Sequence, residues 1–426
     1  MTPTTIQATG AILFAVAILH TFSVGFFARQ AEKHPAHAGL WELFAEVEFV
    51  FGFWAGILLL SIAIAAIGTE SGASLAVAAY LESRDYTEPL FVLAIMIVAA
   101  SKPVILFASA TVRQTSRLLP VAQPIAFYFT ILALVPLLSS FITEPAAMAL
   151  AALILKDAYY RKDMSPRLMY GTLGVLFVNV SIGGTLTNFA APPVLMVAKV
   201  WQWDSLFMLS HIGWRSALAV FINATAITLV FRKELSRFDL SDQRKHDDDG
   251  IPWPVVGLHL LLLFLIVLFA HHPHVFLGIL LIFMAFARAY PRFQERLILR
   301  EGLMVSCFLA GLVTLGGQQS WWLQPLLSRM DTTTVYYSAT ALTAVTDNAA
   351  LTYLGSLVEG LSDEFKYALV TGAVTGGGLT VIANAPNPAG MAILRGHFKN
   401  GAVHPLGLFA AAALPTLVAI LAFRLL

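Results

Sequence analysis

The chain has 426 residues, of which 58% are hydrophobic and only 12% are charged, and its mean hydropathy is +0.77. This composition excludes a soluble multidomain protein and predicts an all-α polytopic membrane protein. The net charge of +1 gives no sign of a nucleic-acid partner, and the single cysteine, Cys307, excludes disulfides, a cysteine zinc site and dithiol redox chemistry. We therefore expect no cofactor and no structural metal, and we expect the lipid bilayer as a partner.

Three apolar stretches in the first part of the chain are long enough to cross about 30 Å of hydrocarbon as helices. They span residues 9–28, 46–68 and 90–110. The first is too long for a signal-peptide core and is followed by Arg29 rather than by a cleavage site, so we expect it to be retained. Lys102 is a charge inside the third stretch. It either pairs with one of the later intramembrane carboxylates, Glu144 or Asp347, or serves as a structural counter-ion.

The next region, residues 121–198, is apolar but interrupted by polar and helix-breaking residues. TEPAAMALAALI begins at Thr143, and Glu144 is followed by Pro145. Proline suits the first turn of a helix, where its missing amide hydrogen costs nothing, and a polar residue suits the position before it. We therefore predict a re-entrant hairpin whose two legs meet at Thr143 and Glu144.

The same region continues with IGGTLTNFAAPP, which begins at Ile182. Gly183 and Gly184 permit irregular backbone, and the prolines at the end of the motif delay the next helix. Non-helical backbone at membrane depth is tolerated only where it is buried in protein or lines a wet cavity. We expect an unwound helix of this kind here, followed by a closing helix over residues 205–231.

The second half is predicted to repeat this order after a solvated cytoplasmic linker, residues 232–250. TDNAALTYLGSL, from Thr346, matches TEPAAMALAALI, and TGGGLTVIANAP, from Thr375, matches IGGTLTNFAAPP. We therefore expect two repeats, 1–231 and 251–426, whose paired interruptions mark a binding site. The second repeat would contain three spanning helices, a second interrupted region and a closing helix, over 252–270, 274–290, 300–316, 331–395 and 404–424.

The basic residues test the orientation of the spans, because cytoplasmic loops carry Lys and Arg in excess. If the N-terminus is outside and both hairpins leave on the side they entered, 19 of the 26 Lys and Arg residues lie inside and 5 lie outside. This bias predicts an outside N-terminus. It also makes the repeats inverted, each with three transmembrane helices, a re-entrant hairpin, an unwound helix and a closing helix.

Both predicted hairpin tips carry a carboxylate, Glu144 in the first and Asp347 in the second. A free helix N-terminus carries a partial positive charge and attracts anions. A carboxylate of the protein placed there neutralises this charge and leaves a pocket rich in hydrogen-bond acceptors. Such a pocket favours a small hard cation, and a desolvated carboxylate can hold either a proton or a cation near neutral pH. The alternative is that both carboxylates are structural caps with no transported ion.

The other candidate ligands are side-chain oxygens around the tips and the unwound helices, including that of Asn387. Na+ is the only metal ion expected, as a transported ion. With the two carboxylates, the predicted cation and proton site consists of Thr143, Thr187, Asn188, Thr346, Asn348, Thr380 and Asn384. The glycines that would permit the unwound backbone are Gly183, Gly184, Gly376 and Gly377.

The two motifs of the second half, TDNAALTYLGSL and TGGGLTVIANAPN, resemble the second-half signature of sodium/proton antiporters in the ion transporter superfamily, and IGGTLTNFAAPP resembles the first-half signature. That superfamily also contains arsenite permeases and divalent anion/sodium symporters; the symporters carry Ser-Asn-Thr at both tips, which this chain lacks. The resemblance covers most of the chain and implies an elevator-type transporter with a dimeric scaffold. TEP at 143–145 departs from the Asn-Asp type of tip, so Asp347 and Asn348 are stronger candidates than Glu144.

The leading hypothesis is therefore secondary active transport, with Na+ or Li+ leaving the cell in exchange for H+ across a bacterial inner membrane. The alternative within the same fold is a cation-coupled carrier of anions or organic acids such as dicarboxylates or arsenite, which Lys102 would favour. A membrane enzyme is a third class of function. The sequence contains no nucleophile with its base, metal cluster or cofactor motif, so we expect no enzyme activity.

Overall fold

The computed structural model describes residues 4–68, 72–160, 164–240, 250–295 and 297–426, and every regular element in these ranges is helical. Six of the helices are long and apolar enough to cross a membrane, or eight if two bent pairs each count as one span. This confirms the all-helical, membrane-capable class. Parts of the predicted regions 121–198 and 232–250 lie outside the described residues, as do five basic residues of the charge count: Arg161, Lys162, Arg244, Lys245 and Arg296.

The first seven α-helices precede the first predicted hairpin. The second predicted span, 46–68, corresponds to α4, whereas α3 and α5 were not predicted. The bounds are α1 (Thr5–Thr21), α2 (Val24–Lys33), α3 (Ala38–Ala45), α4 (Val47–Ala65), α5 (Gly72–Glu82), α6 (Thr87–Ala99) and α7 (Lys102–Arg117).

Two predicted helices are in fact interrupted. The stretch 9–28 divides into α1 and α2, which are bent by 63°, and the stretch 90–110 divides into α6 and α7, which are bent by 67°. At the first break, Ser23 Oγ donates a hydrogen bond to the Leu19 carbonyl (3.1 Å), a back-bond that is known to bend helices. At the second, Pro103 occupies the first turn of α7, where it cannot continue the hydrogen bonding of α6.

The remaining elements of the first half correspond to the predicted hairpin, unwound helix and closing helix. The closing span is continuous from α12 to α13, through a π-helical turn, η4. The bounds are α8 (Gln123–Ile142), α9 (Glu144–Leu155), the π-helical turn η2 (Lys156–Tyr160), α10 (Pro166–Gly183), the 3₁₀ turn η3 (Gly184–Leu186), α11 (Pro192–Trp201), α12 (Ser205–Met208), η4 (Leu209–Gly213), α13 (Trp214–Val230) and α14 (Arg232–Leu235).

The second half follows the same order, with one additional short helix, α18, between its spanning helices and its tip. Predicted helices 252–270 and 274–290 appear as α15 and α16, which have 16 and 17 residues. The bounds are α15 (Trp253–Leu268), α16 (Pro273–Ala289), α17 (Leu299–Gly316), α18 (Ser320–Leu327), α19 (Thr332–Thr343), α20 (Asn348–Ser356), α21 (Asp363–Gly376), α22 (Asn387–Leu394) and α23 (Pro405–Leu425).

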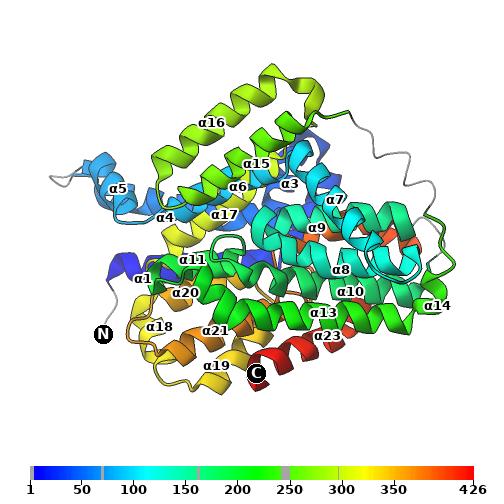
Figure 1. Cartoon of the computed structure of the whole chain (residues 1–426). Helices are drawn as coiled ribbons and strands as arrows, with labels where there is room; N and C mark the ends of the chain where they lie inside the picture. The colour runs from blue at the N-terminus through cyan, green and yellow to red at the C-terminus, as the bar shows by residue number, and fades with distance from the viewer. Residues whose placement is uncertain (1–3, 69–71, 161–163, 241–249, 296) are drawn as a thin grey trace.

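The helices pack in two groups (Figure 1). In the first group, α17 packs against α4 and α6, and α6 also contacts α15 and α16. In the second group, which we call the site-bearing group, α10 lies between α8, α13 and α23, and α9 packs against α8 and α10. In the same group α21 packs against α19 and α20, and α11 packs against α20 and α21. The most apolar part of Pro166–Leu186, which contains α10, is 89% buried, whereas that of Glu48–Ala65 in α4 is 28% buried. Helix α10 is therefore a core element that brings its broken end to the interior of the protein.

Candidate functional site

The first tip is a one-residue break between two packed helices. Helix α8 ends at Ile142, α9 begins at Glu144, and Thr143 between them has a φ of 71°. Positive φ is uncommon for a residue with a side chain and here reverses the chain within a single residue. The Glu144 side chain is fully buried. The predicted position of both tip residues, between the end of one leg and the start of the next, matches this geometry.

The broken end of α10 lies directly against Glu144. A Cβ atom added at Gly184 would stand 2.6 Å from Glu144 Oε1 and 3.2 Å from the Cβ of Ala191. A larger residue here would force the Glu144 carboxylate to move from this position. The second glycine of the pair therefore has a steric role at the tip, in addition to allowing α10 to end.

The second tip is built differently. Asp347 is the N-cap of α20, because its Oδ1 accepts hydrogen bonds from the amides of Ala349 (2.8 Å) and Ala350 (3.4 Å). The neighbouring Asn348 is fully buried, and its backbone N–H donates to the carbonyl of Ala383 in the second unwound segment (3.2 Å). Helix α19 has already ended at Thr343, so this tip is a longer break than the first.

A hydrogen bond between the two halves of the chain joins the first tip to the second unwound segment. Asn384 follows Ala383 in the second unwound segment, and its Nδ2 donates to Glu144 Oε2 (2.8 Å). The Asp347 and Glu144 carboxylates also lie within electrostatic range of each other. The tip of one half, the unwound segment of the other half and both carboxylates therefore form one continuous cluster.

This cluster contains buried polar atoms with no hydrogen-bond partner among the described residues. Buried polar groups are almost always paired, so a group of such atoms needs an explanation. Most of them are oxygens, which are the ligands that small hard cations prefer. They are Thr143 Oγ1, Glu144 Oε1, Thr343 Oγ1, Asn384 Oδ1, Asn387 Oδ1 and both side-chain polar atoms of Asn348.

Three predicted ligands form hydrogen bonds with groups other than the carboxylates. Thr187 Oγ1 donates to the Ser140 carbonyl (2.6 Å), and Thr380 Oγ1 donates to the Ala344 carbonyl (2.8 Å). Asn188 is turned toward the chain after α11, where its Nδ2 donates to the Trp203 carbonyl and its Oδ1 accepts from Ser205. These hydrogen bonds support the backbone around the tips. Those of Asn188 hold its side chain against Trp203 and Ser205 and not against the carboxylates. Thr346 lies next to the cap at Asp347.

Two residues near the cluster were not among the predicted ligands. Thr343 carries one of the unpartnered oxygens, and Glu48 of α4 lies within electrostatic range of Asp347. Thr343 could have been found because it lies three residues before Thr346 in the same polar segment. Glu48 could have been found as an acidic residue in the first turn of an otherwise apolar helix.

Comparison with protein families identifies the family to which the chain belongs. Residues 5–426 match the model of a family described as "Putative Na+/H+ antiporter". The chain belongs to this Na+/H+ antiporter family. No curated protein matches it. Together with its membrane-capable helices, family membership makes this protein an integral, multi-pass membrane transporter of the cation/proton antiporter class rather than an enzyme.

Lys102 of the antiporter is paired with a loop carboxylate. Its Nζ lies 3.4 Å from Glu295 Oε1, in the connection between α16 and α17. Lys102 is also the first residue of α7, directly after the bend from α6. Of the two interpretations of this lysine, the ion pair favours the structural counter-ion.

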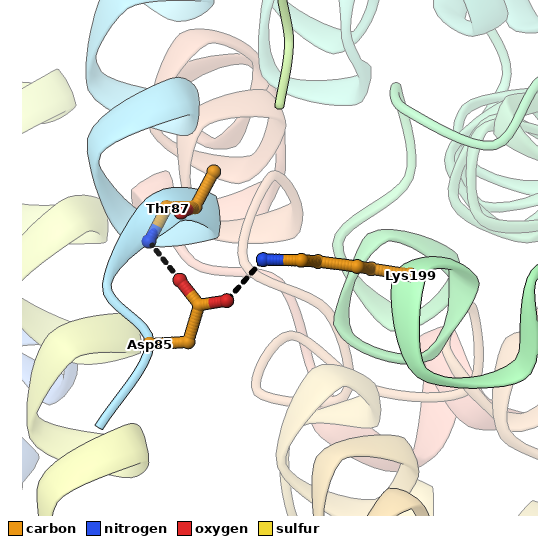
Figure 2. A network of polar contacts seen from close by, with 3 residues as sticks. All are labelled: Asp85, Thr87 and Lys199. Carbon is orange, nitrogen blue, oxygen red and sulfur yellow. Dashed lines mark hydrogen bonds and ion pairs between the residues drawn. The ribbon is translucent and has the colours of Figure 1, made fainter. Parts of the chain in front are cut away.

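A crevice of about 340 Å³ separates the two helix groups on the side of Asn188. Glu88 of α6 and Phe264 of α15 line it from the first group, and Asn188 and Lys199 line it from the site-bearing group. Figure 2 shows that Lys199 of α11 forms an ion pair with Asp85, which precedes α6, while the Thr87 amide donates to the other oxygen of Asp85 (2.9 Å). This ion pair therefore connects the two groups beside the crevice.

The pH range in which this connection persists follows from the electrostatics of Asp85. Partial burial opposes ionisation of this carboxyl, but the hydrogen bonds from Lys199 and Thr87 outweigh burial and hold its pKa below the ordinary value. A carboxyl with a depressed pKa stabilises the folded protein at neutral and higher pH, and the contribution is lost only as pH falls through the lowered value. The ion pair should therefore be intact throughout the neutral range.

Breaking this ion pair should change thermal stability only slightly. Both side chains are about half exposed, at 44% for Lys199 and 51% for Asp85, and such pairs contribute about 1 kcal/mol or less. We expect the melting temperature of Lys199→Met in detergent to fall by less than about 2 °C, equally at pH 6 and pH 9. Lys366→Met, which breaks the pair with Asp363 inside α21, is the matched control. A larger, pH-dependent loss in Lys199→Met alone would contradict this assignment.

Proposed function

We propose that this antiporter exchanges Na+ or Li+ for H+ and that Asp347 and Glu144 are the groups for which the cation and the proton compete. The observation that carries the proposal is the hydrogen bond from Asn384 to Glu144, which joins the two interrupted regions into one buried cluster of carboxylates and oxygens. An intramembrane carboxylate is costly to keep, and this cost is explained if the carboxylate handles an ion.

The chemistry of the cluster suits competition between a proton and a cation. A protonated carboxyl can donate to a neighbouring oxygen, whereas an ionised carboxylate can bind a cation together with the amide oxygens of Asn348 and Asn384. Both states neutralise the same buried charge, so binding one ion removes the need for the other. The cation would be coordinated at Asp347 and Asn348, with Glu144 and Asn384 completing the site from the first tip and the second unwound segment.

We further propose that the two repeats are inverted and that the site-bearing group shifts relative to the first group as an elevator. The corresponding placement of the two tips supports this arrangement: each precedes a short helix, and each lies against the unwound segment of one repeat. Alternating access in such folds is a movement of one bundle against another around a fixed site. The moving part would contain the interrupted regions 121–198 and 331–395 together with the closing helices that pack against them, and the first group would form the scaffold of a homodimer.

The alternative of an anion carrier is less well supported. Lys102 was the feature that favoured it, and this lysine forms an ion pair with Glu295. Four of the unpartnered buried atoms are carboxylate or amide oxygens, Glu144 Oε1, Asn348 Oδ1, Asn384 Oδ1 and Asn387 Oδ1, which accept hydrogen bonds and do not favour an anion.

Ion selectivity can be measured directly in proteoliposomes with an imposed pH gradient. Addition of Na+ or Li+ is expected to dissipate the gradient, because each cation bound releases a proton from the same carboxylates. Citrate, succinate and arsenite, added as salts of a bulky organic cation, should have no effect. A gradient that collapses with one of these anions and not with Na+ or Li+, in protein shown to be folded, would overturn the proposal.

A further inference from the structure

Two glycines at the end of α21, where the second unwound segment begins, lie against polar side chains of the buried cluster. A Cβ atom added at Gly376 would stand 2.8 Å from the Cβ of Thr343, and one added at Gly377 would stand 2.9 Å from Asn348 Nδ2. Asn387, at the start of α22, donates from its Nδ2 to the Gly377 carbonyl (2.8 Å). Thr343, the last residue of α19, therefore lies beside the same pair of glycines as two asparagines of the cluster.

The hydroxyl of Thr343 is not used as the hydroxyls of other buried threonines are. A threonine inside a helix commonly donates to the carbonyl four residues before it. Thr343 is fully buried, and its Oγ1 has no hydrogen-bond partner among the described residues. An unpaired buried hydroxyl is costly, so its presence needs a reason. Five buried helical threonines that do donate to the carbonyl four residues before them are Thr130, Thr172, Thr228, Thr340 and Thr375.

The first half of the chain has Ser140 at the position that corresponds to Thr343, three residues before the tip threonine. The Ser140 hydroxyl donates to the Gly183 carbonyl (2.7 Å) and accepts from the Leu186 backbone N–H (2.9 Å). Both partners belong to the broken end of α10. The hydroxyl of Ser140 therefore holds the first unwound segment, whereas the hydroxyl of Thr343 makes no such contact with the second.

The two halves are alike in the neighbouring contact. Thr187 donates to the Ser140 carbonyl in the first half, and Thr380 donates to the Ala344 carbonyl in the second. Each unwound segment is therefore held against the helix that precedes its tip. The second segment keeps this position without the Thr343 hydroxyl, so a structural need does not explain that hydroxyl.

We propose that the Thr343 hydroxyl oxygen is a ligand of the transported cation. This inference rests on the proposed exchange of Na+ or Li+ for H+ and adds a residue to its binding site. The hydroxyl would act together with the unpartnered amide oxygens of Asn348 and Asn387, which lie at the same pair of glycines. Neutral oxygens of this kind are ligands that small hard cations accept, and they complete a site whose charge is supplied by carboxylates.

The test uses the full-length protein in detergent, with melting temperature recorded as NaCl or LiCl replaces N-methylglucamine chloride at constant ionic strength. A cation that binds the folded protein raises the melting temperature as its concentration increases. Thr343→Val removes the hydroxyl and keeps the branched shape of the side chain. We expect its curve to shift to about tenfold higher Na+ concentration, because one contact with a charged ligand is lost.

The melting temperature without Na+ separates a ligand from a structural hydroxyl. That of Thr343→Val should equal or exceed the wild-type value, because the variant no longer buries an unpaired hydroxyl. Thr343→Ser keeps the oxygen and should respond to Na+ at the wild-type concentrations. Thr340→Val is the matched control in the same helix, since the Thr340 hydroxyl donates to the carbonyls of Tyr336 (2.9 Å) and Gly372 (3.0 Å). It should melt earlier and respond to Na+ as wild type does.

The outcomes distinguish this inference from the proposed function. A wild-type protein that responds to Na+ or Li+, with a Thr343→Val variant that responds at the same concentrations, would overturn the role of Thr343 and leave the exchange proposal standing. A Thr343→Val variant that melts earlier than wild type without Na+, as Thr340→Val should, would make the hydroxyl structural and would also overturn it. A folded wild-type protein with no response to either cation would overturn both proposals.

Discussion

Replacing Asp347 with asparagine is expected to abolish cation/proton exchange while leaving the protein folded. Asparagine is as good an N-cap as aspartate, so the hydrogen bonds to the amides of Ala349 and Ala350 should survive the change. The negative charge and the titratable proton are both lost. One charge in contact with a cation is worth on the order of 4 kcal/mol in a partly buried site, which corresponds to about a 1000-fold lower cation affinity.

The measurement is the Na+-dependent dissipation of a pH gradient in proteoliposomes, with the melting temperature recorded beside it. Asp331→Asn is the matched control, because Asp331 caps α19 through the same pair of amide contacts but is not part of the cluster. The control should transport at the wild-type rate. If Asp347→Asn also keeps the wild-type rate, Asp347 is a structural cap and the proposed site is wrong.

Glu144→Gln is expected to have the second largest effect on exchange. The amide oxygen of glutamine can still accept the hydrogen bond from Asn384, so the contact between the two halves should persist. What disappears is a fully buried negative charge and its proton. A negative charge that acts on the cation from beyond direct contact contributes on the order of 2 kcal/mol to cation binding, so exchange at limiting Na+ should fall roughly 30-fold.

Thermal stability distinguishes a transport group from a structural cap at this position. Removing an unpaired buried charge should leave the melting temperature of Glu144→Gln equal to that of wild type or higher. Glu234→Gln is the control, since Glu234 also accepts hydrogen bonds, from the amide and hydroxyl of Ser165, outside the cluster. A Glu144→Gln variant that melts earlier and still exchanges ions at the wild-type rate would make Glu144 structural.

The sequence already contained the main features of the candidate site. The paired motifs placed both tips and both unwound segments within a few residues, because prolines, glycines and acidic residues are costly in apolar membrane segments and are rarely kept there without a role. The sequence did not place the bends after α1 and α6, since hydrophobic periodicity continues through both breaks. The two bends have local causes: the hydrogen bond from the Ser23 hydroxyl to the Leu19 carbonyl, and Pro103 in the first turn of α7.

The roles of individual polar residues were harder to predict from the sequence, because the type of a hydroxyl or amide side chain does not indicate which group it will contact. Asn188 and Asn384 both lie in unwound segments, yet Asn188 is bound to Trp203 and Ser205 and Asn384 is bound to Glu144. Lys102 is another example, since a charge in an apolar stretch fits either of two partners. The ion pair with Glu295, almost two hundred residues away, is a tertiary contact.

Composition, spacing and local backbone chemistry were thus enough to predict the class of protein and the positions of the two acidic tips. The contact of Glu144 in one half with Asn384 in the other, the room that Gly184 leaves for that carboxylate and the ion pair of Lys199 with Asp85 across the two groups are tertiary features. These contacts join residues far apart in the chain. They depend on how helices with similar apolar faces pack, and an apolar face does not specify its partner.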